Sequence, residues 1–85
     1  MKDEESSLGK DYKDGDIIFE ENSAGREMYI ILTGKAIVIK ERGDVETTLA
    51  TLEEGDFFGE MSLFDNSPRS ATVKALGDVK LLEIN

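Results

Sequence analysis

Short β-prone segments separated by turn residues recur along most of the chain. The strand-like runs cover residues 17–21, 28–32, 35–41 and 45–52. Turn-forming residues stand between them, at 22–25, Thr33-Gly34, 42–44 and 53–56. Short strands with regularly spaced turns predict an all-β sandwich or barrel rather than a series of βαβ units.

The same pattern predicts how the remaining residues are used. Thr33-Gly34 is predicted to close a hairpin between 28–32 and 35–41, and two last strands, 70–75 and 78–84, are predicted around Leu76-Gly77. The only predicted helix is the short segment 60–64. Residues 1–11 are predicted to be a mobile polar leader, and residues 12–85 a single β-barrel core that begins with an inward-facing Tyr12.

Composition excludes several classes of function. The chain contains no cysteine and no histidine, so thiolate and imidazole zinc sites and Ser-His-Asp catalysis are not available to it. We therefore expect a protein that is not an enzyme and uses neither metal nor cofactor. A net charge of −9 argues against binding to nucleic acid or to anionic membranes. No secretory signal precedes the fold, so a cytoplasmic location is expected.

The segment 58–72 combines the features of an anion-binding site. Gly59 allows close backbone approach to a ligand, and the N–H groups at the start of the predicted helical turn favour an anion. Arg69 offers a planar donor pair suited to two phosphate oxygens, beside the small residues Ser70 and Ala71. Glu60 would repel a phosphate but can accept hydrogen bonds from a sugar hydroxyl. Phe57, Phe58 and Phe64 are predicted to anchor this segment in the core.

The motifs F-G-E-M-S-L at 58–63 and P-R-S-A-T-V at 68–73 resemble the phosphate-binding cassette of cyclic nucleotide-binding domains. That family includes the catabolite activator protein and the regulatory subunit of cAMP-dependent protein kinase. The resemblance covers residues 12–84 and implies an eight-stranded jelly-roll barrel with one short helix in the cassette.

The resemblance also implies a role for each cassette residue. It places Glu60 on the ribose 2′-hydroxyl of a cyclic nucleotide and Arg69 on the cyclic phosphate. The pocket would be lined by Gly59, Met61, Ser62, Ser70 and Ala71. Ser70 occupies a position where a hydroxyl often accompanies cGMP binding without requiring it. The resemblance therefore leaves the selectivity between cAMP and cGMP open, with cAMP favoured. The implied function is a sensor module that regulates an unidentified effector.

Family domains normally carry a helix before the barrel and two helices after it, and the sequence shows neither. We therefore expect a binding core that lacks the lid and output helices. The alternative hypothesis is a nucleotide-independent interaction or oligomerisation domain that keeps the same fold as a scaffold. A homodimer formed through exposed strand edges would fit that alternative.

Overall fold

The computed structural model describes residues 9–25, 27–59 and 69–84. All regular elements in that part of the chain are β-strands, and every strand pair is antiparallel. The strands are β1 (Lys10–Tyr12), β2 (Ile17–Phe19), β3 (Met28–Arg42), β4 (Val45–Leu52), β5 (Phe57–Phe58) and β6 (Thr72–Ile84). Within these ranges there is no helix long and apolar enough to cross a membrane.

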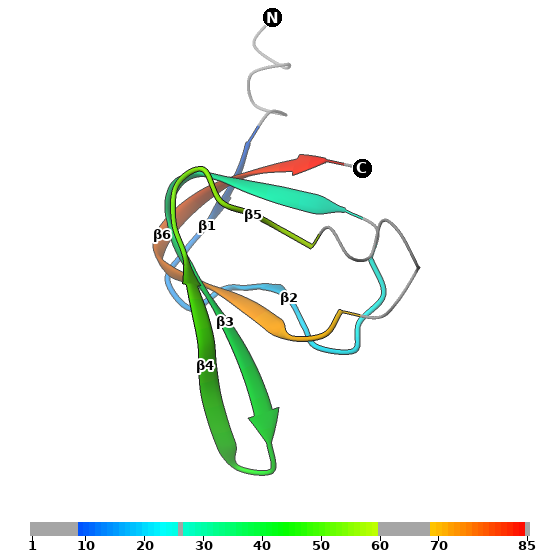
Figure 1. The fold of residues 1–85 in the computed structure, drawn as a ribbon. Helices are drawn as coiled ribbons and strands as arrows, with labels where there is room; N and C mark the ends of the chain where they lie inside the picture. Colours follow the sequence, from blue (N-terminus) through cyan, green and yellow to red (C-terminus); the bar gives the residue numbers. More distant parts are fainter. Residues whose placement is uncertain (1–8, 26, 60–68, 85) are drawn as a thin grey trace, which may run out of the picture.

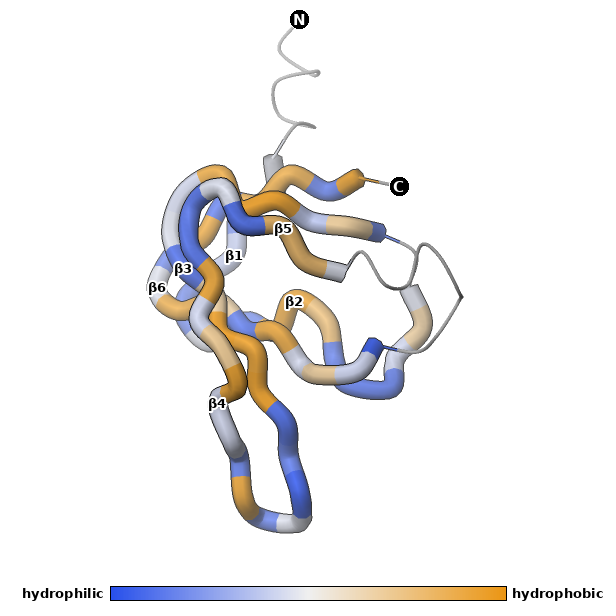
Figure 2. The backbone as a smooth tube through the Cα atoms, viewed as in Figure 1, coloured by the Kyte–Doolittle hydropathy of each residue, from blue (hydrophilic) through white to orange (hydrophobic). Residues whose placement is uncertain are grey.

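Two long strands, β3 and β6, form the centre of the sheet. The strand order is β1-β6-β3-β4. In addition, β2 pairs with β6, and β5 pairs with β3. Because both long strands bend, the sheet curves around on itself, and the β3–β4 hairpin extends away from the body (Figure 1). In Figure 2 the tip of this hairpin is largely hydrophilic, whereas apolar residues concentrate in the curved part of the sheet.

The predicted hairpin at Thr33-Gly34 is wrong. The runs 28–32 and 35–41 are one strand, β3, which bends at Gly34, where φ is +92° and the register with β6 shifts. Likewise, the two last predicted strands are one strand, β6, with Gly77 at φ +76°. The all-β jelly-roll class is confirmed, with each long strand replacing two of the eight predicted ones. The predicted helix at 60–64 lies outside the described residues.

The core lies on the concave side of the curved sheet. Its buried members come from β3, β5 and β6 and are Tyr29, Ile31, Ala36, Phe58, Val73, Ala75, Val79 and Leu81. Tyr12 packs against them, as predicted, together with Ile18, Phe19, Val38 and Leu52. The prediction for Phe57 is wrong: its side chain is 56% exposed, because consecutive residues of β5 point to opposite faces.

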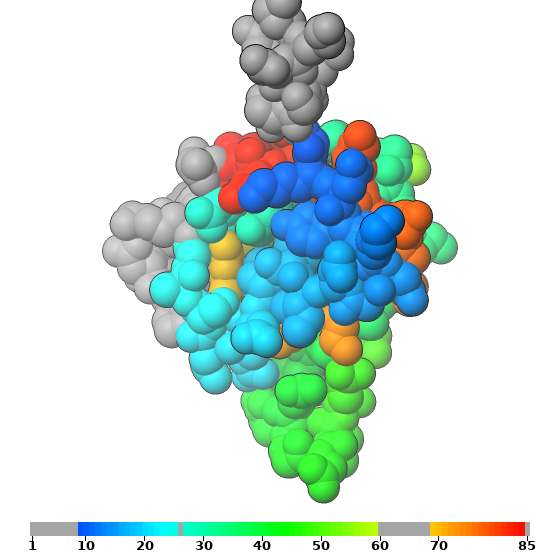
Figure 3. Space-filling model, turned by 180° about the vertical axis from the view of Figure 1, so that it is seen from behind, coloured from blue at the N-terminus to red at the C-terminus, as the bar shows by residue number. Residues whose placement is uncertain are grey.

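The ordered sheet begins before the predicted boundary at Tyr12. Lys10 and Asp11, assigned to the leader, pair with Leu81 and Lys80 of β6. Seen from behind, residues 10–25 lie across the surface above the β3–β4 hairpin (Figure 3). The segment that precedes β3 thus covers one side of the barrel and leads directly to the neighbourhood of Arg69.

Candidate functional site

Arg69 stands just before β6 and is one of the most buried polar residues that the structure describes, with 4% of its surface exposed. Its backbone is fixed by the turn that follows β2. The Arg69 N–H donates to the carbonyl of Ser23 at 2.9 Å, and its carbonyl accepts from the N–H of Asn22 at 2.7 Å. Asn22 adopts a positive φ of 71°, which asparagine tolerates better than most residues. The predicted turn at 22–25 therefore holds the backbone of Arg69 in place through these two hydrogen bonds.

Three separate elements orient the guanidinium of Arg69. Nη1 donates to the carbonyl of Gly59 at 3.2 Å, and Nη2 donates to the carbonyl of Glu27 at 3.0 Å. The Glu27 carboxylate also lies 3.6 Å from Nη2, close enough for an ion pair. The guanidinium carbon lies 4.2 Å from the centre of the Phe19 ring, a cation–π distance. The charge is thus held in one orientation by Phe19 of β2, by Gly59 directly after β5 and by Glu27 directly before β3.

Gly59 is required by this arrangement. Its φ is +87°, in the region that disfavours residues with a Cβ, and an added Cβ would lie 3.0 Å from both Arg69 Nη1 and the Glu27 carbonyl oxygen. The sequence predicted that Gly59 lets backbone approach a ligand. That role stays a prediction, whereas the structure shows that Gly59 lets the backbone approach Arg69.

The other predicted site residues divide into two groups. Ser70 and Ala71 follow Arg69 directly, Ser70 exposed and Ala71 buried. Glu60, Met61 and Ser62 lie outside the described residues. The structure therefore brings Gly59 and Arg69 together, with Ser70 and Ala71 adjacent along the chain.

Sequence reasoning missed two residues of the site, Phe19 and Glu27. Phe19 was assigned only to a strand, and Glu27 was not singled out at all. Phe19 belongs to an aromatic cluster, with its ring centroid 6.0 Å from that of Tyr29 and 5.9 Å from that of Phe58. Tyr29 and Phe58 stack at 5.2 Å, and burial raises the pKa of the Tyr29 hydroxyl. The cluster fixes the Phe19 ring beneath the guanidinium.

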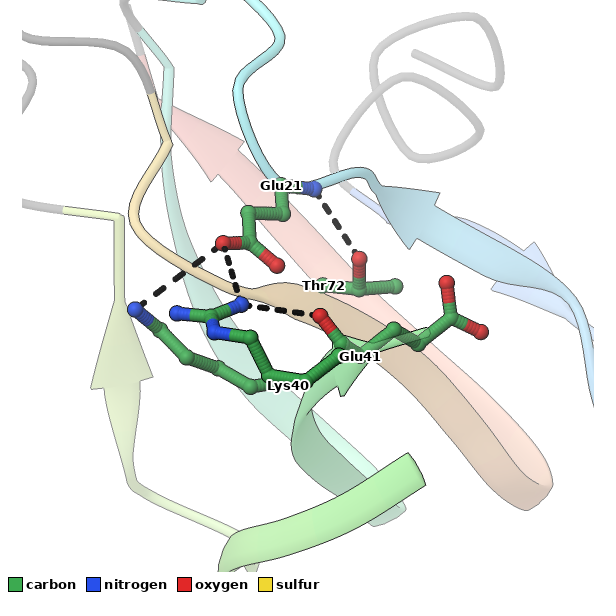
Figure 4. Close-up of polar contacts among 5 residues, drawn as sticks. Glu21, Lys40, Glu41 and Thr72 are labelled. Atoms are coloured by element: carbon green, nitrogen blue, oxygen red, sulfur yellow. Dashed lines mark hydrogen bonds and ion pairs between the residues drawn. The ribbon is translucent and has the colours of Figure 1, made fainter. Parts of the chain in front are cut away.

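A second polar cluster lies where the residues after β2 meet the end of β3, close to the turn of the β3–β4 hairpin. The Glu21 carboxylate there receives Arg42 Nη1 at 3.4 Å and Lys40 Nζ at 3.9 Å, while Thr72 Oγ1 accepts from the Glu21 N–H at 2.9 Å (Figure 4). An open groove of about 480 Å³ adjoins it. Because Glu20 and Glu41 line this groove together with Glu21, and because its cations are partly exposed, it is less suited to an anion than the buried Arg69 site.

Comparison with known proteins agrees with this geometry. Residues 9–85 match the family model described as the cyclic nucleotide-binding domain. The chain is 41% identical over 69 residues to a cAMP-dependent protein kinase regulatory subunit of Mucor circinelloides f. lusitanicus, a match that covers 81% of this chain and 16% of that subunit. It is 39% identical over 74 residues to the cyclic AMP receptor protein of Thermus thermophilus, covering 86% and 34% of the two chains.

A solved structure shows the same fold. The cAMP-bound form of the EAL enzyme Bd1971 superposes with a TM-score of 0.87 at 42% identity, over 91% of this chain and 21% of that chain. The chain thus spans about a third or less of each of these proteins. Because one family model covers nearly the whole chain and the relatives share its sequence over more than 80% of its length, the chain belongs to the cyclic nucleotide-binding domain family.

Proposed function

We propose that the chain is a non-catalytic sensor module that binds a cyclic nucleotide monophosphate. The observation that carries this proposal is the buried, oriented guanidinium of Arg69. Burying a charge costs free energy unless the charge is hydrogen-bonded and paired. A guanidinium that is held buried in one orientation is therefore better suited to binding an anionic ligand than a solvated surface arginine is. In a chain of net charge −9 it provides the local positive site that an anionic ligand needs.

Each cassette residue takes a role in this proposal. Arg69 binds the cyclic phosphate together with the N–H groups of Ser70 and Ala71, and Glu60 accepts from the ribose 2′-hydroxyl. Gly59, Met61 and Ser62 line the pocket. Each charge-assisted hydrogen bond to the phosphate contributes about 1.5–3 kcal/mol.

A preference for cAMP over cGMP is part of the proposal. The Mucor and Thermus relatives are named for cAMP, which supports it. The EAL enzyme Bd1971 has both a cAMP-bound and a cGMP-bound form, so this fold accommodates either base. Since the chain spans only part of its relatives, we propose that it serves as the sensing part of a cytoplasmic signalling protein, whose effector is not identified.

The experiment is a calorimetric titration of the chain with cAMP, cGMP and 5′-AMP. We expect micromolar or tighter binding of cAMP, weaker binding of cGMP, and little binding of 5′-AMP, which lacks the cyclic phosphate. Arg69→Ala should weaken cAMP binding by roughly 100-fold or more, the loss expected for two charge-assisted bonds. The matched control is Arg42→Ala, because Arg42 is an exposed arginine paired with Glu21. Millimolar or absent cAMP binding by the parent chain would sink the proposal.

One observation favours the alternative of an interaction or oligomerisation domain. β4 pairs only with β3 among the described strands, its residues 45–51 are all exposed, and Glu46 is its one charged residue. Long exposed edge strands with few charges can pair with another chain. Sedimentation of the chain at increasing concentration distinguishes the two functions: a dimer without cAMP binding supports the alternative, and a monomer that binds cAMP supports the sensor.

A further inference from the structure

Gly25 lies against the guanidinium of Arg69. A Cβ added at Gly25 would stand 2.6 Å from Nη2, 3.0 Å from Nε and 3.1 Å from Cζ of Arg69. These three atoms are the nearest ones, so the edge formed by Nη2 and Nε fills the place that a side chain would take. The φ of Gly25 lies outside the left-handed region, so alanine there suffers no backbone strain. The atoms nearest to a Cβ at this position thus all belong to the guanidinium of Arg69.

Phe19 supports the same group through its ring face. The guanidinium carbon lies 4.2 Å from the ring centre, and the ring is fixed in turn by Tyr29 and Phe58. A cation over an aromatic face is attracted by the ring quadrupole, and the attraction grows when both are shielded from water. Leucine would keep much of the apolar volume of Phe19 but would remove this attraction.

We infer that Phe19 and Gly25 are positioning residues, which set the orientation of Arg69 and hence the affinity for the ligand's phosphate. The part of this inference that concerns affinity rests on the proposed function. The part that concerns the orientation of the Arg69 side chain does not depend on it. A Cβ at Gly25 would have to gain about 0.8 Å from Nη2 to reach ordinary van der Waals contact at 3.4 Å. A displacement of this size would turn the guanidinium away from the carbonyls of Gly59 and Glu27.

The first test measures cAMP binding by Gly25→Ala and Phe19→Leu. We expect Gly25→Ala to weaken binding about 10- to 100-fold, the cost of misplacing a positioned group by up to roughly 1 Å. Phe19→Leu should weaken it about 3- to 10-fold, a typical loss for one cation–π contact. The matched controls are Gly9→Ala, whose Cβ would meet only flexible side chains, and Phe57→Leu on the exposed face of β5. Loss of affinity in the controls equal to that in the two variants would overturn the inference.

The second test does not need a ligand. Thermal unfolding of the unliganded chain is compared for Gly25→Ala in the parent and in the Arg69→Ala background, as a double-mutant cycle. We expect Gly25→Ala to lower the melting temperature of the parent and to leave that of the Arg69→Ala chain unchanged. An equal fall in melting temperature in both backgrounds would show that the alanine disturbs only the turn at 22–25, independently of Arg69, and would overturn the inference. If the parent bound no cAMP, the proposed function would fail while this cycle still decided the positioning roles.

Discussion

Gly59 and Gly55 have nearly the same φ. Comparing their alanine variants therefore measures how much the packing around Arg69 contributes to stability. Gly59 has φ +87° and Gly55 has φ +89°, so alanine at either position carries a similar backbone cost of roughly 1–2 kcal/mol. Their surroundings differ. A Cβ at Gly55 would meet nothing within 4 Å, whereas one at Gly59 would lie 3.0 Å from Arg69 Nη1 and from the Glu27 carbonyl oxygen.

The difference between Gly59→Ala and Gly55→Ala therefore isolates the contact with Arg69 and Glu27. Forcing extra atoms into a packed site costs about 1–3 kcal/mol. For a domain of this size, each 1 kcal/mol lowers the melting temperature by roughly 4–8 °C. We predict that Gly59→Ala melts at least about 4 °C below Gly55→Ala in differential scanning calorimetry without ligand. Equal melting temperatures would show that Gly59 is required by its backbone alone, and that the packing around Arg69 is looser than described.

Two further predictions concern the rest of the fold. Gly34→Ala should destabilise the chain more than Gly25→Ala, Gly55→Ala or Gly59→Ala, because its Cβ would overlap the Asp78 carbonyl oxygen and lie 3.0 Å from Val79 Cα. Urea unfolding of these four variants measures the difference, and a midpoint for Gly34→Ala equal to that of Gly55→Ala would contradict the close approach of β3 and β6. Burial raises the pKa of Tyr29 above its ordinary value near 10, so the unfolded chain loses this proton first and the free energy of unfolding should fall as the pH rises through 10 and above. Tyr29→Phe should remove part of that fall above about pH 10 in urea titrations, and an unchanged pH dependence would refute the buried, neutral hydroxyl.

Local patterns predicted most of the strands but not how they join. The runs 28–32 and 35–41 were located correctly, and so was the turn predicted at 42–44, except that Arg42 is the last residue of β3. Thr33-Gly34 was misinterpreted because a glycine with positive φ serves equally well in a hairpin turn and in a bend within a continuous strand. Only the pairing of both halves of β3 with β6 distinguishes the two, and that pairing joins residues more than 30 positions apart.

The sequence predicted the charged residue of the candidate site, Arg69, but not the residues that hold its side chain in place. Arg69 stood out because turn residues and small side chains surround it in the sequence. Its partner Glu27 lies 42 residues away, and Phe19 comes from a different strand, so no local spacing connects them with Arg69. Gly25 was recognised only as a turn residue, and its contact with the guanidinium depends on how the turn at 22–25 packs against the start of β6.

The central claim is that the phosphate of a cyclic nucleotide binds to Arg69, and side-chain NMR tests it most directly. The chain contains three arginines, Arg26, Arg42 and Arg69, so a spectrum of ¹⁵N-labelled arginine Nε–H groups is simple to assign with Arg69→Lys and Arg42→Lys. On titration with cAMP, we predict that the Arg69 signal shifts most and saturates at one equivalent, while the Arg42 signal stays in place. An unmoved Arg69 signal at saturating cAMP would contradict the account.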